Sequence, residues 1–241
     1  MNMLKQNIVI QAPRLYLAAL IAIAIILAVS LYLTDPNSDA RWISVLSGFV
    51  SGLAIASFQF LTQYLEQKAL AEYKKHGLVE FLPNRKNPDY YRSLIKNTQV
   101  GDKIVVVGVT CNRLLDDFAN PKVSNSQDLI EAMARGVEVT LLLPKSKYLN
   151  KEDESDFINK TLPKSEEILK SHKDKFKLRY YDFEPSHSIF LAGNTCLVGP
   201  IFKNKKSKDT PAINLDRSGL FTKPYLDYLS EIIDESSTSH E

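Results

Sequence analysis

Cysteine is scarce in this chain of 241 residues, which contains only Cys111 and Cys196. Neither has a second Cys or a His at metal-ligand spacing, so neither zinc binding nor haem attachment is expected. Two isolated thiols are typical of a reducing compartment, where such residues stay buried and unpaired. The sequence therefore predicts no metal and no cofactor.

Several motifs of phosphate and acyl chemistry are also missing. The sequence contains neither G-x-x-x-x-G-K nor G-x-G-x-x-G, the loops that cradle phosphates. It also lacks the G-x-S-x-G turn that carries a nucleophilic serine. Its 30 basic and 28 acidic residues nearly balance, so broad coating of nucleic acid is not expected. Any contact with a polyanion must be local.

Charge is absent from two long stretches near the start of the chain. Residues 15–34 and 42–65 contain no Asp, Glu, Lys, Arg or His. At 1.5 Å per residue they would span about 30 and about 36 Å, enough to cross the hydrocarbon core of a bilayer. We expect two transmembrane helices forming a helical hairpin, with a short turn at 35–41. Proton relay and ion-coupled transport are not expected, because both need ionisable groups inside the membrane.

The charges that flank these stretches predict an orientation. Lys5 and Arg14 precede the first stretch, and Lys68, Lys74 and Lys75 follow the second, whereas the turn between them holds two acids and one base. Because basic residues concentrate on the cytoplasmic side, both termini are expected in the cytoplasm of a multi-pass membrane protein.

The second stretch carries small residues at every fourth position. Ser44, Gly48, Gly52 and Ala56 form one stripe on a helix, where small side chains let two helices approach closely. The stripe either packs against the first stretch of the same chain or joins copies of the chain into a homo-oligomer. The sequence leaves both alternatives open.

The remaining chain alternates between strand and helix patterns. A helical stalk is expected at 66–76, an α/β domain at 77–234 and a disordered polar tail at 235–241. Apolar or alternating runs predict strands, helical spacing predicts helices, and Gly193-Asn194 predicts a hairpin turn. This order implies one mixed sheet with helices on its faces. The predicted strands are 103–109, 137–143, 176–182, 186–192, 195–198 and 212–215, and the predicted helices are 88–97, 113–119, 126–135, 155–172 and 222–233.

Two phrases in this region, EAMARGVEVTLLLP at 131–144 and HSIFLAGNTCLVGP at 187–200, resemble phospholipase D-like domains. That family uses H-x-K-x(4)-D, in which the His attacks phosphorus and the Lys stabilises phosphate oxygens. The His falls on His187, the Lys on Ile189 and the Asp on Asn194. The resemblance thus implies a degenerate, non-catalytic domain. The alternative is a membrane-tethered phosphodiesterase that uses His187 and Asn194 on lipid or nucleic acid.

Two membrane helices joined to such a degraded domain are also similar to membrane effectors of retron-type anti-phage systems. The resemblance implies a toxic inner-membrane protein that disrupts membrane integrity when it is released or activated through its cytoplasmic sensing domain. It further implies a partner, a reverse transcriptase with its branched DNA–RNA product, that keeps the effector inactive.

Lysines gather after two of the predicted strands. One group follows the hairpin, and a pair follows the strand at 137–143. Such lysines bind phosphates of nucleic acid or of anionic lipid headgroups, or simply solvate a loop. The pair lies just past the carboxyl end of its strand, where open α/β sheets bind ligands, and we expect it to share a face with the loop that follows the hairpin. The two groups comprise Lys203, Lys205, Lys206 and Lys208 after the hairpin, and Lys145 and Lys147 after the other strand.

Overall fold

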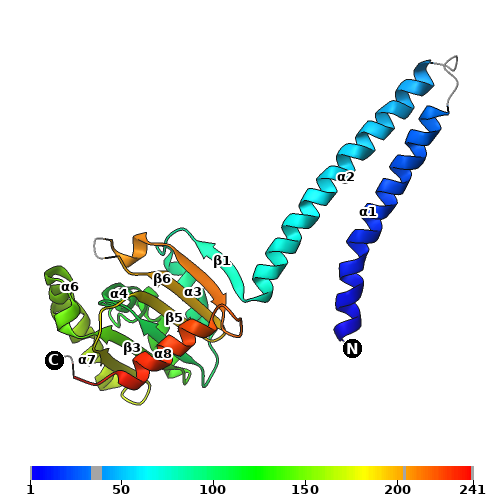
Figure 1. Ribbon diagram of the computed structural model, residues 1–241. Helices are drawn as coiled ribbons and strands as arrows, with labels where there is room; N and C mark the ends of the chain where they lie inside the picture. Colours follow the sequence, from blue (N-terminus) through cyan, green and yellow to red (C-terminus); the bar gives the residue numbers. More distant parts are fainter. Residues whose placement is uncertain (1, 34–39, 203–204, 240–241) are drawn as a thin grey trace. The chain divides into compact units, whose positions relative to one another are not determined.

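The computed structural model describes residues 2–33, 40–202 and 205–239, with side chains from Leu17 onward apart from residues 40 and 42. It divides into two compact units, Met1–Tyr73 and Lys74–Glu241, which are described separately below. Figure 1 traces the chain through both units.

The first unit contains α1 (Asn2–Tyr32) and most of α2 (Ala40–Lys75). One helix, Ile43–Lys75, is long and apolar enough to cross a membrane. The described apolar part of α1 is only Leu17–Tyr32, which spans about 24 Å against the roughly 30 Å of a bilayer core. The prediction of two transmembrane helices in a multi-pass hairpin is therefore wrong for the described residues. The prediction rested on the absence of charge, and the uncharged stretch at 15–34 is longer than the apolar helix Leu17–Tyr32. Most of the predicted turn at 35–41 lies outside the described residues.

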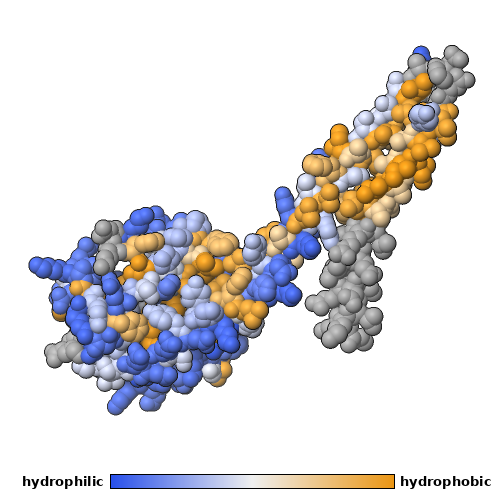
Figure 2. Space-filling view, viewed as in Figure 1, coloured by the Kyte–Doolittle hydropathy of each residue, from blue (hydrophilic) through white to orange (hydrophobic). Residues whose placement is uncertain are grey.

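The apolar surface of α2 is uncovered in the structure. None of its most apolar stretch is buried, and Ile55 and Phe58 are 60% and 68% exposed. Figure 2 shows the hydrophobic colour running along this helix. A helix of a soluble domain turns such residues toward a core. The length, composition and exposure of α2 are therefore those of a helix that is able to cross a membrane.

The second unit begins where α2 ends. Gly77 has φ +98°, which terminates the helix, and its N–H donates to the carbonyl of Lys74 at 3.0 Å. A Cβ at Gly77 would lie 2.5 Å from the Cα of Gly219, in the turn before α8. Asp216 N also donates to the carbonyl of Gly77 at 2.7 Å. Only glycine fits this close approach of two backbone segments.

Seven strands form one mixed sheet in the order β1-β7-β6-β5-β2-β3-β4. The pairs β2–β3 and β3–β4 are parallel and the others are antiparallel, which confirms the predicted mixed α/β sheet. The first strand was not predicted. The strands are β1 (Leu78–Leu82), β2 (Lys103–Val107), β3 (Glu138–Pro144), β4 (Phe176–Tyr181), β5 (His187–Ala192), β6 (Thr195–Pro200) and β7 (Ala212–Asp216).

Helices cover both faces of the sheet. Because side chains alternate along a strand, Ile104, Val106 and Leu141 pack toward α3, α4, α5 and α7, whereas Val105 and Leu142 pack toward α8. The long helix predicted at 155–172 begins earlier and contains a π-helical turn, Phe157–Thr161, between α6 and α7. The helices are α3 (Pro88–Lys96), α4 (Asn112–Phe118), α5 (Asp128–Ala134), α6 (Lys151–Asp156), α7 (Leu162–Ser171) and α8 (Lys223–Glu235).

The chain after α8 is partly ordered, unlike the disordered tail predicted from residue 235. Ser237 forms an antiparallel bridge with Tyr180 of β4, with N–H···O distances of 2.7 and 2.8 Å. Arg179 Nη2 donates to the carbonyl of Ser236 at 2.7 Å. The tail thus covers the outer edge of β4, a tertiary contact that polar composition alone does not reveal.

Candidate functional site

One edge of the sheet collects most of the basic side chains of interest. The register pairs Val107 with Ile189 and His187 with Pro200, so the ends of β2, β3 and β6 meet the start of β5. The lysine groups predicted after β3 and β6 therefore lie at the same edge. We call it the basic edge and define it by Arg85, Lys86, Lys145, Lys147, Lys205, Lys206 and Lys208. Lys203 lies outside the described residues.

The lysine pair after β3 shares one acidic partner. Lys145 Nζ lies 3.5 Å and Lys147 Nζ 2.5 Å from the carboxylate oxygens of Asp182. The hydrogen bond from Lys147 lowers the pKa of Asp182, and the same contact raises the pKa of Lys147. The positive charge at this end of the edge is consequently halved by a neighbour that was not foreseen.

The lysines after β6 also have neighbours. Lys206 Nζ lies 3.8 Å from Glu152 at the start of α6, and Lys205 Nζ lies 5.9 Å from the ring centre of Phe202, which is 49% exposed. On the other side of the same loop, Lys86 Nζ pairs with Asp209 at 3.0 Å, which lowers the pKa of that carboxyl group. The loop is basic overall, and its ion pairs are exposed and therefore weak.

Arg85, in the turn between β1 and α3, was not predicted as a site residue. Its Nη1 donates to Ser188 Oγ, and its Nη2 donates to Thr210 Oγ1 and, at 3.4 Å, to the carbonyl of Pro200. A Cβ at Gly199 would lie 3.0 Å from the guanidinium carbon, so glycine leaves room for it. The only hint in the sequence is an arginine in a proline-flanked turn, PNRKNP, without an acid beside it.

Arg113 of α4 fixes the turn that carries Arg85. Its Nη1 donates to the carbonyl of Arg85 at 3.1 Å and its Nη2 to the carbonyl of Lys86 at 2.8 Å. Its Nε pairs with Asp117 at 3.0 Å. The backbone at 85–86 is therefore held against α4, which positions the Arg85 side chain.

His187 also lies at the basic edge, but its side chain is on the face of the sheet that α8 covers, opposite to the face of Arg85. Its Nδ1 is 2.9 Å from Ser186 Oγ, and its ring contacts Tyr225 and Tyr228 of α8 at centroid distances of 5.9 and 6.2 Å. Ile189, at the position of the family lysine, is 1% exposed in the apolar core beneath α8. A hydrocarbon side chain there cannot stabilise a phosphate oxygen.

Asn194 is far from His187. It belongs to the turn at the other end of β5, where its carbonyl accepts from Arg217 N at 2.9 Å. The five steps from His187 to Ala192 alone cover about 17 Å at 3.3 Å per residue. The structure does not bring the two residues of the catalytic alternative into one site.

The cysteines have inert surroundings. Burial raises the pKa of Cys111 and of Cys196 to about 12, so both thiols are protonated near neutrality and are poor nucleophiles. Within the described residues, no group of three His, Cys, Asp or Glu side chains is arranged to hold a metal ion.

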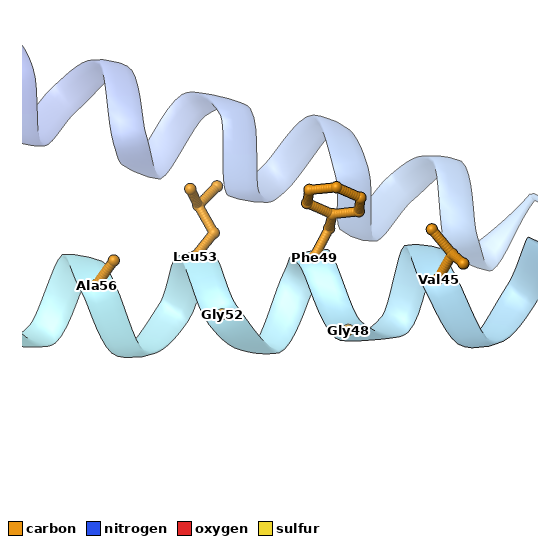
Figure 3. A pocket seen from close by; sticks show the side chains of 6 residues that line it. All are labelled: Val45, Gly48, Phe49, Gly52, Leu53 and Ala56. Atoms are coloured by element: carbon orange, nitrogen blue, oxygen red, sulfur yellow. The ribbon is translucent and has the colours of Figure 1, made fainter.

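A shallow groove on α2 coincides with the predicted stripe. Its volume is about 440 Å³, and a Cβ at Gly48 or Gly52 would meet no described atom within 4 Å. Figure 3 shows Val45, Phe49 and Leu53 pointing to one side of α2, beside the bare glycines. Ser44, Gly48, Gly52 and Ala56 line this helix at every fourth position. The described part of α1 therefore leaves the two glycines of the stripe unfilled.

No family model matches the chain, and no curated protein matches it in sequence. Among solved structures, TrmBL2, an archaeal chromatin protein with a novel mode of DNA binding, aligns at 14% identity over 83% of this chain and 69% of its own, with a TM-score of 0.42. That overlap is too weak to carry an inference about fold or function.

Proposed function

We propose that this chain is a toxic membrane effector of a retron-type anti-phage system, held inactive by a reverse transcriptase with its branched DNA–RNA product. The observation that supports it is α2, whose Ile43–Lys75 segment is long, apolar and uncovered. In this proposal the helix lies in the inner membrane. Lys74 and Lys75 in its last turn favour a cytoplasmic location for the α/β domain, because basic residues concentrate on that side.

The membrane lesion requires several copies, because a single helix per chain cannot line a pore. The stripe of Gly48, Gly52 and Ala56 is suited to close contact between such helices. We therefore propose that released chains form a homo-oligomer through α2 and that this assembly lets ions leak across the inner membrane.

The basic edge is the proposed recognition surface. Lys205, Lys206 and Lys208 follow the hairpin at the edge where β3 also ends, and phosphates of the branched product are the natural ligands of such lysines. Their exposed ion pairs are weak enough to be exchanged for phosphate contacts. Binding at this edge would keep the chains apart until infection disturbs the complex.

The oligomer proposal is tested by inducing the chain in bacteria and following membrane potential with a voltage-sensitive dye. The wild type should depolarise the cells. Gly48→Leu with Gly52→Leu should abolish depolarisation at equal expression, because bulky side chains prevent close helix contact. Ala54→Leu, on another face of α2, should retain it. If the wild type leaves the membrane potential unchanged, the effector proposal is wrong. If the double variant is as toxic as the wild type, the stripe has no role in the oligomer.

The restraint proposal is tested by co-expressing the reverse transcriptase and its RNA. Lys205→Glu, Lys206→Glu and Lys208→Glu together should make the chain toxic even with the partner present, because repulsion replaces phosphate contacts. In the matched control, Lys170 and Lys173 are both replaced by Glu. Lys170 lies in the last turn of α7 and Lys173 just after it, away from the basic edge. If the triple variant remains restrained, the basic edge is not the recognition surface.

A further inference from the structure

We infer that the guanidinium of Arg85 binds a terminal phosphate group that enters from the basic edge. The inference concerns a single half-buried side chain and does not depend on whether the chain permeabilises membranes. It begins from a charge that the described surroundings leave uncompensated.

The charge of Arg85 has no acidic partner among the described ion pairs. Its contacts are the hydroxyls of Ser188 and Thr210 and the carbonyl of Pro200, all neutral oxygens. Buried cations in proteins are normally paired, because leaving one unpaired forfeits its hydration without compensation. Burial accordingly lowers the pKa of Arg85.

The hydrogen-bonding capacity of the group is also incomplete. A guanidinium has five N–H donors, whereas the described contacts use three. Its Nε is buried and has no partner in the part of the chain that the structure describes. An unsatisfied buried donor in a native protein commonly marks an ion or a water molecule at that position. One Nη1 donor, the buried Nε donor and the whole positive charge are therefore without a described partner.

Two acids close to the partners of Arg85, one beside Thr210 and one on α4, are already engaged. Asp209 pairs with Lys86 at 3.0 Å and Asp117 with Arg113 at 3.0 Å. Burial raises the pKa of Tyr91, on which the charges of Arg85 and Arg113 act in the opposite direction. A guanidinium without an acidic partner is suited to an oxyanion, which it binds through charge-assisted hydrogen bonds.

The partial burial of Arg85 selects the form of the phosphate. The side chain is half-buried, and its guanidinium lies against the backbone of Gly199. A phosphodiester inside a polymer carries substituents on both sides, whereas a terminal phosphate exposes three oxygens and can approach a half-buried group with one end. Inorganic phosphate and the headgroup of a phosphomonoester lipid share this chemistry.

The test is calorimetric titration of the full-length chain in detergent with inorganic phosphate, at ionic strength matched with chloride. Wild type should bind, and Arg85→Gln should lower the affinity about tenfold or more, as expected for loss of charge-assisted hydrogen bonds. Arg217→Gln is the control, because Arg217 follows β7 at the opposite edge and its guanidinium has only a 3.4 Å contact with the carbonyl of Gly193 among the described bonds. It should bind as the wild type does.

Arg85→Lys is a second variant that tests the site even if the glutamine variant does not fold. It keeps the charge but loses the planar fork, so a folded lysine variant, checked by circular dichroism, should still bind phosphate more weakly than the wild type. A short-chain phosphatidic acid identifies the source: tighter binding than inorganic phosphate assigns the site to lipid headgroups, and equal binding assigns it to free phosphate. No heat beyond the chloride control, or unchanged affinity in the folded Arg85 variants, would mean that Arg85 only braces its loops.

Discussion

The two units use the same apolar side chains in opposite ways. In the α/β domain, Leu141 and Leu142 are fully buried between the sheet and its helices. In α2, Ile55 and Phe58 remain largely exposed, although these side chains are as apolar as the two leucines of the domain. The domain buries its own apolar side chains, whereas those of α2 are uncovered in the described structure. Four sets of substitutions test this difference between the two units.

The largest effect is expected in the core. Leu141→Ala should lower the free energy of unfolding of the domain by about 2–5 kcal/mol, because it leaves a cavity in a close-packed layer. Ile55→Ala should leave that free energy nearly unchanged, because Ile55 packs against no core in the described structure. Urea unfolding in detergent, followed by circular dichroism, measures both. Equal losses would show that α2 belongs to the folded core.

A charge in α2 should have the next largest effect. Ile55→Lys places an ammonium group near the middle of the apolar segment, at a cost of about 2.5–3.5 kcal/mol for membrane insertion. The variant should move from the membrane fraction to the supernatant after high-speed sedimentation. Ala71→Lys, in the polar last turns of α2, should remain in the membrane. Sedimentation of both variants with the membrane would contradict a spanning role for Ile43–Lys75.

The junction between helix and domain should be less sensitive. Gly77→Ala combines an unfavourable positive φ with a clash against Gly219, whereas Gly101 has φ +86° and no described atom within 4 Å of the position that a Cβ would take. We expect Gly77→Ala to destabilise the domain by about 1–3 kcal/mol and Gly101→Ala by less, since only strain acts there. Thermal unfolding compares the two. A Gly101 variant as unstable as the Gly77 variant would remove the importance of the close approach.

The smallest effect is expected at the exposed Asp182. Because the hydrogen bond from Lys147 lowers the pKa of this carboxyl group, its contribution to stability exists above the unfolded pKa, about 3.9, and is lost as the pH falls through the lowered folded value. Asp182→Asn should therefore differ from the wild type at pH 7 and converge with it in acid. Urea unfolding across this range would show parallel curves if the ion pair contributes nothing.

Strong local patterns made most of the domain predictable. The β-branched run before Gly108 and the turn Gly193-Asn194 place β2 and the β5–β6 hairpin where they occur, because a buried strand and a tight turn each need particular residue types. The strand LVEFL at 78–82 was missed because it lies at an open edge, with its three central residues exposed. Such a strand has no buried run to reveal it.

Features that depend on tertiary contacts were not predictable in this way. The bridge between Ser237 and Tyr180 orders a polar tail, and the position of Arg85 depends on Ser188 and Thr210, more than a hundred residues away. For the basic edge, the topology could be anticipated from strand order, but the acids that pair with the lysines could not. The composition of a segment predicts its own secondary structure, whereas these sites depend on contacts between segments that are far apart in the sequence.

The pairing of β1 with β7 sets an order of events during synthesis. Leu78, just after α2, pairs with Leu215 of β7. A ribosome adding 5–20 residues per second needs on the order of 10 s to make the intervening segment. Throughout that interval α2 is already complete while the sheet still lacks its partner strand. The pairing of β1 therefore waits for β7, and α2 is complete before the sheet can close.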